Sequence, residues 1–373
     1  MSTTVSRSSR TSLMGMPPPD PVLPSVGQSI SDIRDSSMAA MPKPVARDQR
    51  PTIQDVAALA GLSPSTVSRV LSGARPVGPD IAERVRQAAD ALSFRPNTVA
   101  RSLRTQQTST VGLVIPDIIN PFFPLLVQAV ERATREHDLS VLLVDCGNEP
   151  ERETSALDLL LDRRVDAIFI SPCHSTASAP ALRSASRRAR IVQIDRVADD
   201  QLPFAIVDQG HGIQLLLEHL TATGRQHIAF IGSDPSASTS SLRADAFERF
   251  SVAQNPRQSP RVMTGDFSGA SSASITRSLL EQWPDTEAIV CANDVIAAGA
   301  LLVARERRLE GLPGFAVTGF DNTMVAETGD LTSVQQPLSE LANRAVDLFL
   351  GVAATEPPPL LPTLVVRGST GPR

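Results

Sequence analysis

The segment that most constrains the fold lies near the N-terminus and reads TIQDVAALAGLSPSTVSRVLSG. Thr52 can cap a first helix, with Asp55 three residues later beside the positive end of that helix. Gly61 supplies a tight turn, Ser63 can cap a second helix, and Pro64 suits that helix's first position, where an N–H is not needed. This pattern predicts a helix-turn-helix unit, whose second helix enters the major groove of DNA.

Two further segments extend this unit. Residues 79–92 begin with proline and carry apolar residues at helical spacing, which predicts a third helix that closes a small core. Residues 97–104 are compatible with a helix capped by Asn97. Because so short a helix is not stable alone, we expect it to order only when it is bound or packed.

Charge divides the chain into a basic N-terminal part and an acidic remainder. Residues 51–106 carry seven arginines against four acidic residues, whereas the whole chain has a net charge of −5. This asymmetry fits a DNA-binding head on a soluble sensor. Residues 1–50 are rich in serine and proline, which is typical of a disordered arm. The alternative is a tail that contacts DNA through Arg7, Arg10, Lys43, Arg47 and Arg50.

From residue 111 onward, apolar runs alternate with helical stretches. The runs that indicate strands are 111–116, 141–145, 167–171, 191–195, 227–231, 288–292 and 315–320. Strands and helices alternating at this spacing predict parallel sheets with helices on both faces. The length of this region indicates two similar lobes.

The motifs VAALAGLSPSTVSRVLSG, RPNTVARSLRT and VGLVIPDIINPFF resemble the LacI/GalR family of bacterial transcriptional regulators. The resemblance implies a small all-α helix-turn-helix head plus an α/β periplasmic-binding-protein-like sensor of two doubly wound lobes. The implied parts are a disordered extension (1–50), the head (51–96), a hinge helix and linker (97–109) and an effector-binding and dimerisation domain (110–373). The lobes of that domain are expected to comprise 110–208 with 338–352, and 209–337 with 353–373.

The resemblance places DNA contacts in the second helix and in the hinge. They are Ser63, Pro64, Ser65, Thr66, Ser68, Arg69, Asn97, Ala100, Arg101, Leu103 and Arg104. Arg69 can make a bidentate contact to guanine, or alternatively a phosphate contact that chooses no sequence. Leu103 matches an apolar wedge in the minor groove, although it could instead be a linker residue that packs on the core. The spacing of Val67, Val70 and Leu71 predicts core positions.

The residues that resemble the ligand contacts of the family are Asp195, Arg196, Arg243, Asn293 and Asp321, although Ala246 stands where the family usually has a glycine after the arginine. Asn120 and Phe122, in the stretch after the first predicted strand, are further candidates for effector binding. Asp195 ends a predicted strand, and Asn293 and Asp321 each follow one. Ligands of open parallel sheets collect beyond the carboxyl ends of strands. Carboxylates and an asparagine suit sugar hydroxyls, whereas an arginine suits a hydroxyl pair, a carboxylate or a phosphate. The stretch NEPERETSALDLLLDRRVDAIFIS is similar to the fructose-repressor branch of the family, which senses phosphorylated fructose. The implied effector is therefore a sugar or sugar phosphate.

Several of these residues also have a purely structural interpretation. Asp294, which starts a helix after a predicted strand, can be a helix cap instead of a ligand contact. Asp195 can simply pair with Arg196. Phe122 and Phe123 can pack in the core instead of forming the wall of a cleft.

Two competing functions find little support. A periplasmic sugar-binding protein shares the sensor fold, but the N-terminus lacks an apolar signal-peptide core, so export is not expected. An enzyme is not expected either, because there is no GxGxxG after a strand, no P-loop and no nucleophile–base cluster. Cys146, Cys173 and Cys291 are scattered and form neither a zinc signature nor a disulfide framework. We therefore expect no metal and no cofactor.

The resemblance implies a cytoplasmic homodimer in which each head reads one half of a pseudo-palindromic operator in double-stranded DNA. No apolar run is long enough to span a bilayer, so no membrane partner is expected. No heptad pattern follows the last predicted strand, near residues 364–366, which argues against a coiled-coil tetramer.

Overall fold

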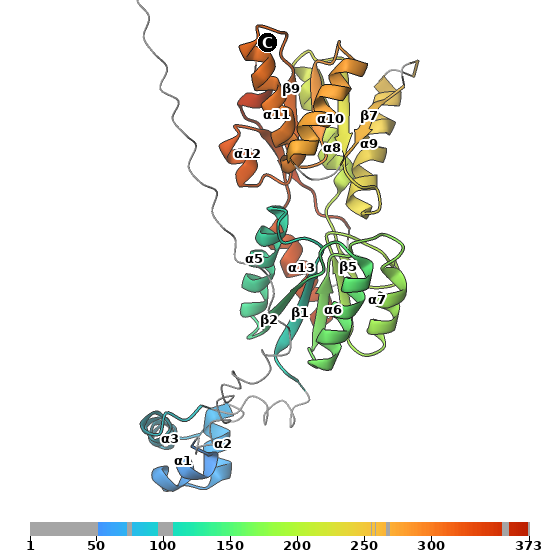
Figure 1. The fold of residues 1–373 in the computed structure, drawn as a ribbon. Coiled ribbons are helices and arrows are strands. Elements are labelled where there is room, and N and C mark those ends of the chain that lie inside the picture. The colour runs from blue at the N-terminus through green and yellow to red at the C-terminus, as the bar shows by residue number, and fades with distance from the viewer. Residues whose placement is uncertain are drawn as a thin grey trace, which may run out of the picture. The chain divides into compact units, whose positions relative to one another are not determined.

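A computed structural model describes residues 51–72, 77–95, 107–254, 256–257, 259–265, 269–352 and 358–371. The chain forms two compact units, one up to Pro96 and one from Asn97 onward (Figure 1).

The described residues of the first unit form three helices, α1 (Ile53–Ala60), α2 (Pro64–Ser72) and α3 (Pro79–Ala91). Thr52 and Asp55 form a reciprocal capping box at the start of α1, and Gly61 ends that helix in the left-handed conformation. The Thr66 N–H donates to Ser63 Oγ over 3.2 Å, so Ser63 caps α2. The three helices bury one small core, which consists of Val56, Ala57, Ala60, Val67, Val85, Ala88 and Ala89.

The second unit begins with a lobe built on a parallel five-stranded sheet in the order β2-β1-β3-β4-β5. Its strands are β1 (Thr110–Ile115), β2 (Ser140–Asp145), β3 (Ala167–Ile170), β4 (Arg190–Ile194) and β5 (Phe204–Ala205). Helices α5 (Phe122–Arg135) and α13 (Leu338–Leu350) contribute to the core on one face of the sheet. Helices α6 (Pro150–Asp162) and α7 (Ala179–Ser186) contribute to the core on the other face. In β1, Leu113 and Val114 therefore point into different cores, as the period of a strand requires.

The second lobe contains a six-stranded sheet in the order β11-β10-β9-β8-β6-β7. Its strands are β6 (Ile228–Gly232), β7 (Arg261–Thr264), β8 (Ala288–Cys291), β9 (Ala316–Phe320), β10 (Thr332–Gln335) and β11 (Thr363–Val365). All pair in parallel except β11, which is antiparallel to β10. The helices are α8 (Gln209–Ala222), α9 (Ser238–Gln254), α10 (Gly269–Gln282), α11 (Asp294–Leu309), α12 (Met324–Thr328) and the short η1 (Gly368–Thr370).

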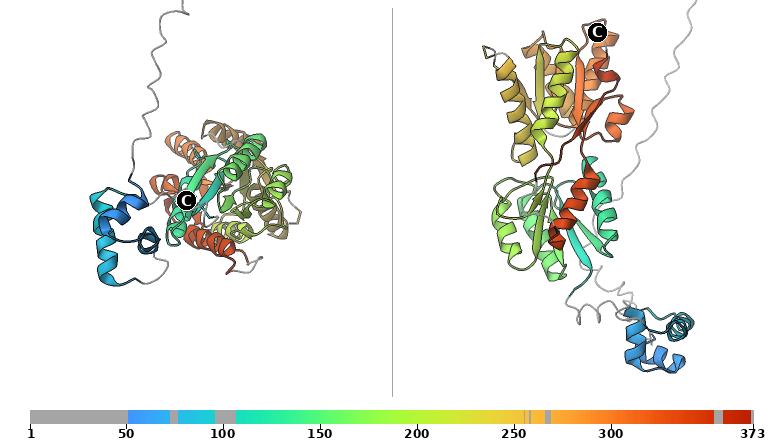
Figure 2. Two further views of the ribbon diagram at one scale, coloured as in Figure 1. Left: turned by 90° about the horizontal axis from the view of Figure 1, so that it is seen from below. Right: turned by 180° about the vertical axis from the view of Figure 1, so that it is seen from behind.

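The chain crosses between the lobes more than once. After β10 it returns to the first lobe as α13, which packs on α5, β4 and β5 (Figure 2, right). It then passes back to form β11 in the second sheet. Val207 and Leu360, which lie on two of these crossings, form a parallel bridge. The chain segments that cross between the two lobes therefore pair with one another.

All seven strands predicted from apolar runs are confirmed. The four additional strands β5, β7, β10 and β11 are short, and the sequence TSVQ of β10 is mostly polar although Thr332 and Ser333 are fully buried. These buried hydroxyl groups are tolerated because both form hydrogen bonds. Ser333 Oγ donates to the buried Asp294, and Thr332 Oγ1 lies 2.8 Å from Thr370 Oγ1. Among the described residues, no helix has both the length and the apolar character to cross a membrane.

Candidate effector pocket and DNA-recognition helix

Helix α2 presents a polar surface opposite its buried side. Ser65 and Arg69 are exposed, whereas Val67 is fully buried, as its spacing predicted. The Ser63 hydroxyl lies 2.8 Å from Ser65 Oγ and 2.9 Å from Thr66 Oγ1. The residues predicted to contact DNA from this helix, namely Ser63, Pro64, Ser65, Thr66, Ser68 and Arg69, are therefore all at least partly accessible. The predicted hinge contacts Asn97, Ala100, Arg101, Leu103 and Arg104 lie outside the described residues.

A polar pocket lies in the second unit, where segments from both lobes meet. It brings together all seven residues that the sequence predicts as effector contacts: Asn120, Phe122, Asp195, Arg196, Arg243, Asn293 and Asp321. Phe123, Ser233, Thr239, Ser240 and Ala292 complete the lining. The residues follow β4, β6, β8 and β9 or lie at the start of α5 and in the first two turns of α9. This placement is typical of parallel sheets, because ligands usually bind beyond the carboxyl ends of the strands.

Arg243 on α9 is the central residue of the pocket. Its guanidinium donates from Nε to Gln209 Oε1 over 2.8 Å and from Nη1 to the Ala292 carbonyl. Nη2 donates to Asp321 Oδ1 over 3.4 Å. The guanidinium carbon lies 3.6 Å from the centre of the Phe320 ring, which adds a cation–π contact. Arg243 is buried, and these contacts hold its side chain in one orientation.

The first lobe contributes an acid and a base that are adjacent in sequence. Asp195 follows β4 with a φ of 68°, a left-handed conformation that aspartate tolerates better than most residues. Its Oδ2 atom lies 3.7 Å from Arg196 Nε, and both side chains are more than nine-tenths buried. Burial raises the pKa of Asp195 to about 6, although the charges of Arg196 and Arg243 act in the opposite direction. Burial likewise lowers the pKa of Arg196.

The pairing of Asp195 and Arg196 leaves several hydrogen-bonding atoms unused. Asp195 Oδ1 and the Nε and Nη1 atoms of Arg196 are buried and have no hydrogen-bond partner among the described residues. The structural interpretation, that Asp195 only pairs with Arg196, therefore accounts for one oxygen of the carboxylate and leaves the other unexplained. Buried polar atoms of this kind normally have a partner, and a polar ligand in the pocket would supply one.

Asn293 and Asp294, which follow β8, have different roles in the structure. The sequence could not show which of them caps a helix and which lines the pocket. Asn293 caps α11, because its side chain accepts a hydrogen bond from the Ile296 N–H over 2.8 Å, and it also lines the pocket. Asp294 does neither. Its carboxylate accepts hydrogen bonds from the Thr323 N–H over 2.6 Å and from Ser333 Oγ over 2.6 Å, and none of these three residues lines the pocket. Burial raises the pKa of Asp294 to about 7.

Asn120 and the two phenylalanines form the first-lobe wall of the pocket. Asn120 Oδ1 accepts a hydrogen bond from the Phe122 N–H over 3.1 Å, which fixes the start of α5. The rings of Phe122 and Phe123 meet edge to face with their centres 5.1 Å apart, and both are buried in the core. Both interpretations of these rings therefore hold, because they pack in the core and line the pocket.

Three polar residues of the lining, Ser233, Thr239 and Ser240, were not predicted. Ser233 directly follows β6, and Ser233 Oγ lies 2.7 Å from Ser240 Oγ in the first turn of α9. The same rule that selected Asp195 and Asp321, a polar residue after a buried strand, would have selected Ser233. The serine-rich run before Arg243 carried the signal for the other two.

A second, larger pocket on the second lobe is a weaker candidate. It is lined by residues that include Arg225, His227 and Arg261. Arg261 forms two hydrogen bonds of 2.8 Å with Asp285, and His227 lies 3.5 Å from the same carboxylate. Arg225 donates to the Gly371 carbonyl over 2.6 Å. Both arginines already have partners, and His227 Nδ1 is the buried side-chain atom of this lining without a hydrogen bond among the described residues, whereas the pocket around Arg243 contains three such atoms on Asp195 and Arg196.

Comparison with known families supports both units. Residues 108–358 match the family described as periplasmic binding proteins and sugar binding domain of the LacI family, and residues 52–97 match bacterial regulatory proteins of the lacI family. The ribose operon repressor of Halalkalibacterium halodurans is 33% identical over 328 residues, which span 86% of this chain and 97% of that protein.

Two solved structures share the fold over most of both chains. The Lac repressor dimer bound to operator and the anti-inducer ONPF is 27% identical, with a TM-score of 0.76, 86% of this chain covered and 99% of that one. The complex of the transcriptional regulator CelR with cellobiose is 29% identical, with a TM-score of 0.60, 86% of this chain covered and 100% of that one.

Proposed function

Because this chain belongs to the LacI family of bacterial regulatory proteins, we propose that it is a repressor whose affinity for operator DNA is set by a neutral sugar bound around Arg243. The chain is a DNA-binding transcriptional regulator with an effector-binding domain, and it is not an enzyme. The proposal concerns the chemistry of the effector and the residues that bind it and DNA.

The observation that carries this proposal is the unsatisfied polarity of the pocket. Asp195 Oδ1 accepts hydrogen bonds only, and Arg196 Nε and Nη1 donate only. A sugar hydroxyl can donate and accept at once, so neighbouring hydroxyls of one ring can serve both groups. The buried Phe122 and Phe123 rings offer an apolar surface beside these groups, which suits the C–H face of a sugar.

Charge balance favours a neutral sugar over a phosphorylated one. The pocket contains two carboxylates, Asp195 and Asp321, and two guanidinium groups, Arg196 and Arg243. Because Arg243 already binds Asp321, only Arg196 has free donors for a phosphate, and the Asp195 carboxylate lies directly beside it. Of the proteins named above, one is a ribose operon repressor and another was solved in complex with cellobiose. A sugar phosphate, including the phosphorylated fructose of the fructose-repressor branch, is the second candidate.

A thermal-shift screen of the full chain tests the effector class. Neutral mono- and disaccharides form one panel, and phosphorylated hexoses form the other. We expect a neutral sugar to raise the Tm, because a ligand that binds only the folded state stabilises it by mass action. Stabilisation by sugar phosphates alone would contradict the neutral-ligand proposal and favour the fructose-repressor branch, and no stabilisation by either panel would exclude a sugar effector.

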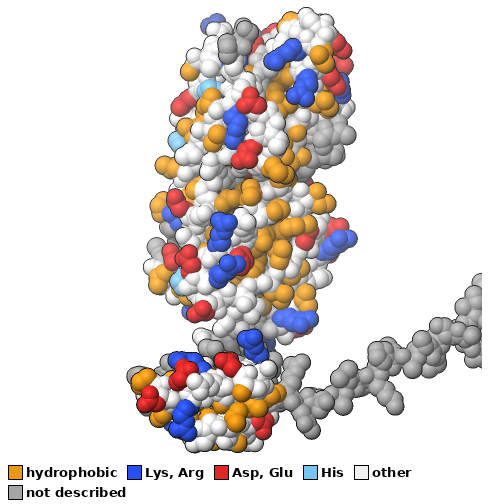
Figure 3. Space-filling model, turned by 90° about the vertical axis from the view of Figure 1, so that its left-hand side faces the viewer, with side chains coloured by type: hydrophobic (Ala, Val, Ile, Leu, Met, Phe, Trp, Pro, Cys, Tyr) orange, Lys and Arg blue, Asp and Glu red, His pale blue; other side chains and the backbone are white. Residues whose placement is uncertain are grey.

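A homodimer is the proposed assembly, in which each head reads one half of a pseudo-palindromic operator. Exposed apolar side chains lie around α5 and the edge strand β2, namely Ile118, Ile119, Leu125, Leu142 and Leu143. Figure 3 views the second unit from the side of α5 and shows hydrophobic side chains gathered on the first lobe. Exposed apolar side chains gathered on one lobe suit an interface with a second copy of the chain, and the related Lac repressor is a dimer on its operator. We place this regulator in the cytoplasm, where it meets its DNA.

Arg69→Ala is expected to relax sequence preference. If Arg69 binds guanine through two hydrogen bonds, its loss should reduce discrimination at that base pair by about 1–3 kcal/mol. The measurement is fluorescence anisotropy at fixed salt, with duplexes selected by the wild type and with single-base variants of them. Arg86→Ala, on the exposed side of α3, is the matched control. An equal loss of affinity for all duplexes would mean that Arg69 contacts phosphate only.

Leu103→Ala is expected to weaken specific binding and to reduce DNA bending. An apolar wedge that partly unstacks a base step kinks the duplex by roughly 20° or more. A permutation bending assay on the selected operator measures this angle, and Leu309→Ala, at an exposed leucine of α11, serves as the control. An unchanged bend angle in the Leu103 variant would remove the wedge role.

A further inference from the structure

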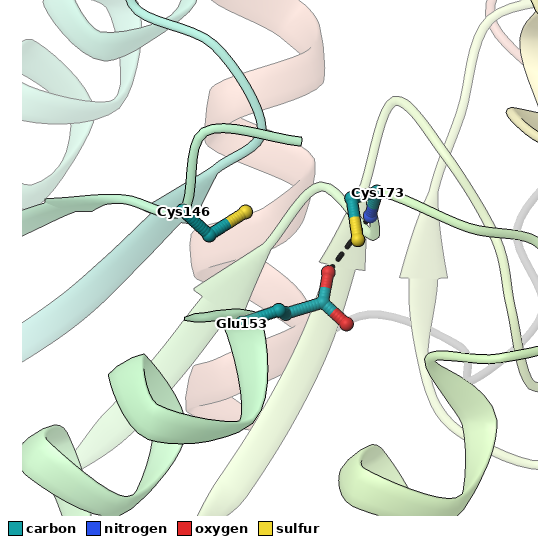
Figure 4. Close-up of side chains that lie close together, drawn as sticks. All are labelled: Cys146, Glu153 and Cys173. Atoms are coloured by element: carbon teal, nitrogen blue, oxygen red, sulfur yellow. Dashed lines mark hydrogen bonds between the residues drawn. The ribbon is translucent and has the colours of Figure 1, made fainter. Parts of the chain in front are cut away.

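Three side chains that can bind a metal lie together in the first lobe, away from the lining of the effector pocket. Cys146 follows β2, Glu153 lies near the start of α6, and Cys173 follows β3 (Figure 4). In sequence, they are too far apart to form a recognisable motif, and the sequence therefore predicted no metal site. The fold brings them together because β2 and β3 flank β1 in a parallel sheet and α6 lies between them along the chain.

The geometry of this cluster is compact and closed to solvent. One ligand atom from each of the three residues lies within 4.8 Å of the other two. Cys146 and Glu153 are fully buried, and Cys173 is 2% exposed. The Cys173 N–H donates to Glu153 Oε2 over 2.7 Å, which fixes the orientation of the carboxylate. The other oxygen, Oε1, is buried and has no hydrogen-bond partner among the described residues.

The carboxylate of Glu153 lacks the compensation that a buried charge requires. It takes part in none of the ion pairs formed by the described residues. A buried carboxylate is normally paired with a cation or bound to a metal, because leaving it unpaired is costly. The backbone N–H of Cys173 is the partner of Oε2, but Oε1 has no partner among the described residues.

We propose that Cys146 Sγ, Cys173 Sγ and Glu153 Oε1 bind one zinc-like divalent cation. Two thiolates and a carboxylate are ligands that Zn²⁺ accepts, and their negative charge would be balanced largely by the ion. The hydrogen bond from the Cys173 N–H to Oε2 would then orient the ligating carboxylate, as outer partners of metal ligands commonly do. A disulfide between the two cysteines would leave Glu153 Oε1 without a partner, so the carboxylate favours the metal over the disulfide.

The position of the cluster connects it to both lobes. Two residues before Cys173, Ser171 Oγ donates to Asp195 Oδ2 in the effector pocket over 3.4 Å. Two residues after it, the Ser175 N–H donates to the Ser236 carbonyl of the second lobe over 2.7 Å. A bound ion would therefore fix a segment that contacts the pocket on one side and the second lobe on the other.

The test uses the full chain, from which a chelator removes metal under reducing conditions. The chain is then refolded from urea in the presence of Co²⁺, so that the ion can reach the buried cluster before the fold closes around it. We expect one Co²⁺ per chain with a thiolate-to-cobalt charge-transfer band, which Zn²⁺ displaces. Glu153→Gln keeps the shape and the acceptor for the Cys173 N–H, and it should weaken Co²⁺ binding by at least the roughly 10–100-fold that loss of an outer-shell partner costs. The control is Cys291→Ser, because Cys291 is a buried thiol of the second lobe outside the cluster.

Three results would overturn the proposal. The first is reduced wild-type protein that refolds, as shown by its circular dichroism, without a thiolate-to-cobalt band. The second is a band that persists in a Cys146→Ser/Cys173→Ser double variant. The third is Co²⁺ affinity that Glu153→Gln leaves unchanged, which would restrict any site to the two thiols.

Discussion

Replacing Arg243 by alanine is expected to lower the free energy of unfolding of the second unit by about 3–5 kcal/mol and to abolish the response to the effector. The substitution leaves the buried Asp321 carboxylate without its cation and removes the donors to Gln209 and to the Ala292 carbonyl. Urea denaturation followed by tryptophan fluorescence measures the loss. Trp283 is the single tryptophan of the chain and packs on the core of the second lobe, so its emission reports on this unit.

Two variants separate stability from binding. Arg249→Ala removes an exposed arginine from the same helix and should change stability little. The double variant Arg243→Met/Asp321→Asn removes both buried charges, so it should recover much of the lost stability while the effector response stays absent. If the single Arg243→Ala variant unfolds like the wild type, the network described around Arg243 does not stabilise the fold.

Asp195 is expected to make the stability of the second unit depend on pH. Burial raises its folded pKa to about 6, whereas the ordinary value is 3.8. Between pH 3.8 and about pH 6, Asp195 is therefore protonated in the folded protein and ionised in the unfolded chain. The stabilisation that Asp195 contributes is therefore present below about pH 4 and is lost as pH rises through 6, by about 3 kcal/mol in total.

The comparison with Asp195→Asn isolates this contribution. Asparagine does not titrate, and it tolerates the left-handed conformation of this position. The difference in unfolding free energy, wild type minus variant, should fall as pH rises from 4 to 7. Asp200→Asn, at an exposed neighbouring position, should give a difference that hardly changes with pH. A wild-type advantage over Asp195→Asn that grows with pH would mean that Asp195 is stabilised as the ionised form.

Local chemistry made the first unit predictable. Thr52, Asp55 and Gly61 act within a few residues of their positions, so their capping roles could be read without knowledge of the tertiary structure. The central strands were predictable for a related reason, since strands buried on both faces are continuous apolar runs. β5 and β10 could not be predicted, because one has two residues and the other depends on hydrogen bonds to distant side chains.

The sequence predicted which residues would line the pocket, but it did not predict what each of them does there. Strand ends and the family resemblance selected Asp195, Arg243 and Asp321, which the structure brings together. The sequence could not show that Asn293 caps α11 while its neighbour Asp294 faces Thr323 and Ser333, because that choice depends on side chains about 30 to 40 residues away. The approach of Cys146 to Cys173 was missed for the same reason.

The central claim is that ligand binding around Arg243 controls DNA affinity. The most direct test is a titration of the selected operator with the wild type, with and without a saturating sugar that raises the Tm. We expect operator affinity to change by about 5–150-fold, the range that corresponds to coupling of 1–3 kcal/mol, and Arg243→Met/Asp321→Asn to show no such change. An operator affinity that the stabilising sugar leaves unchanged in the wild type would contradict the account.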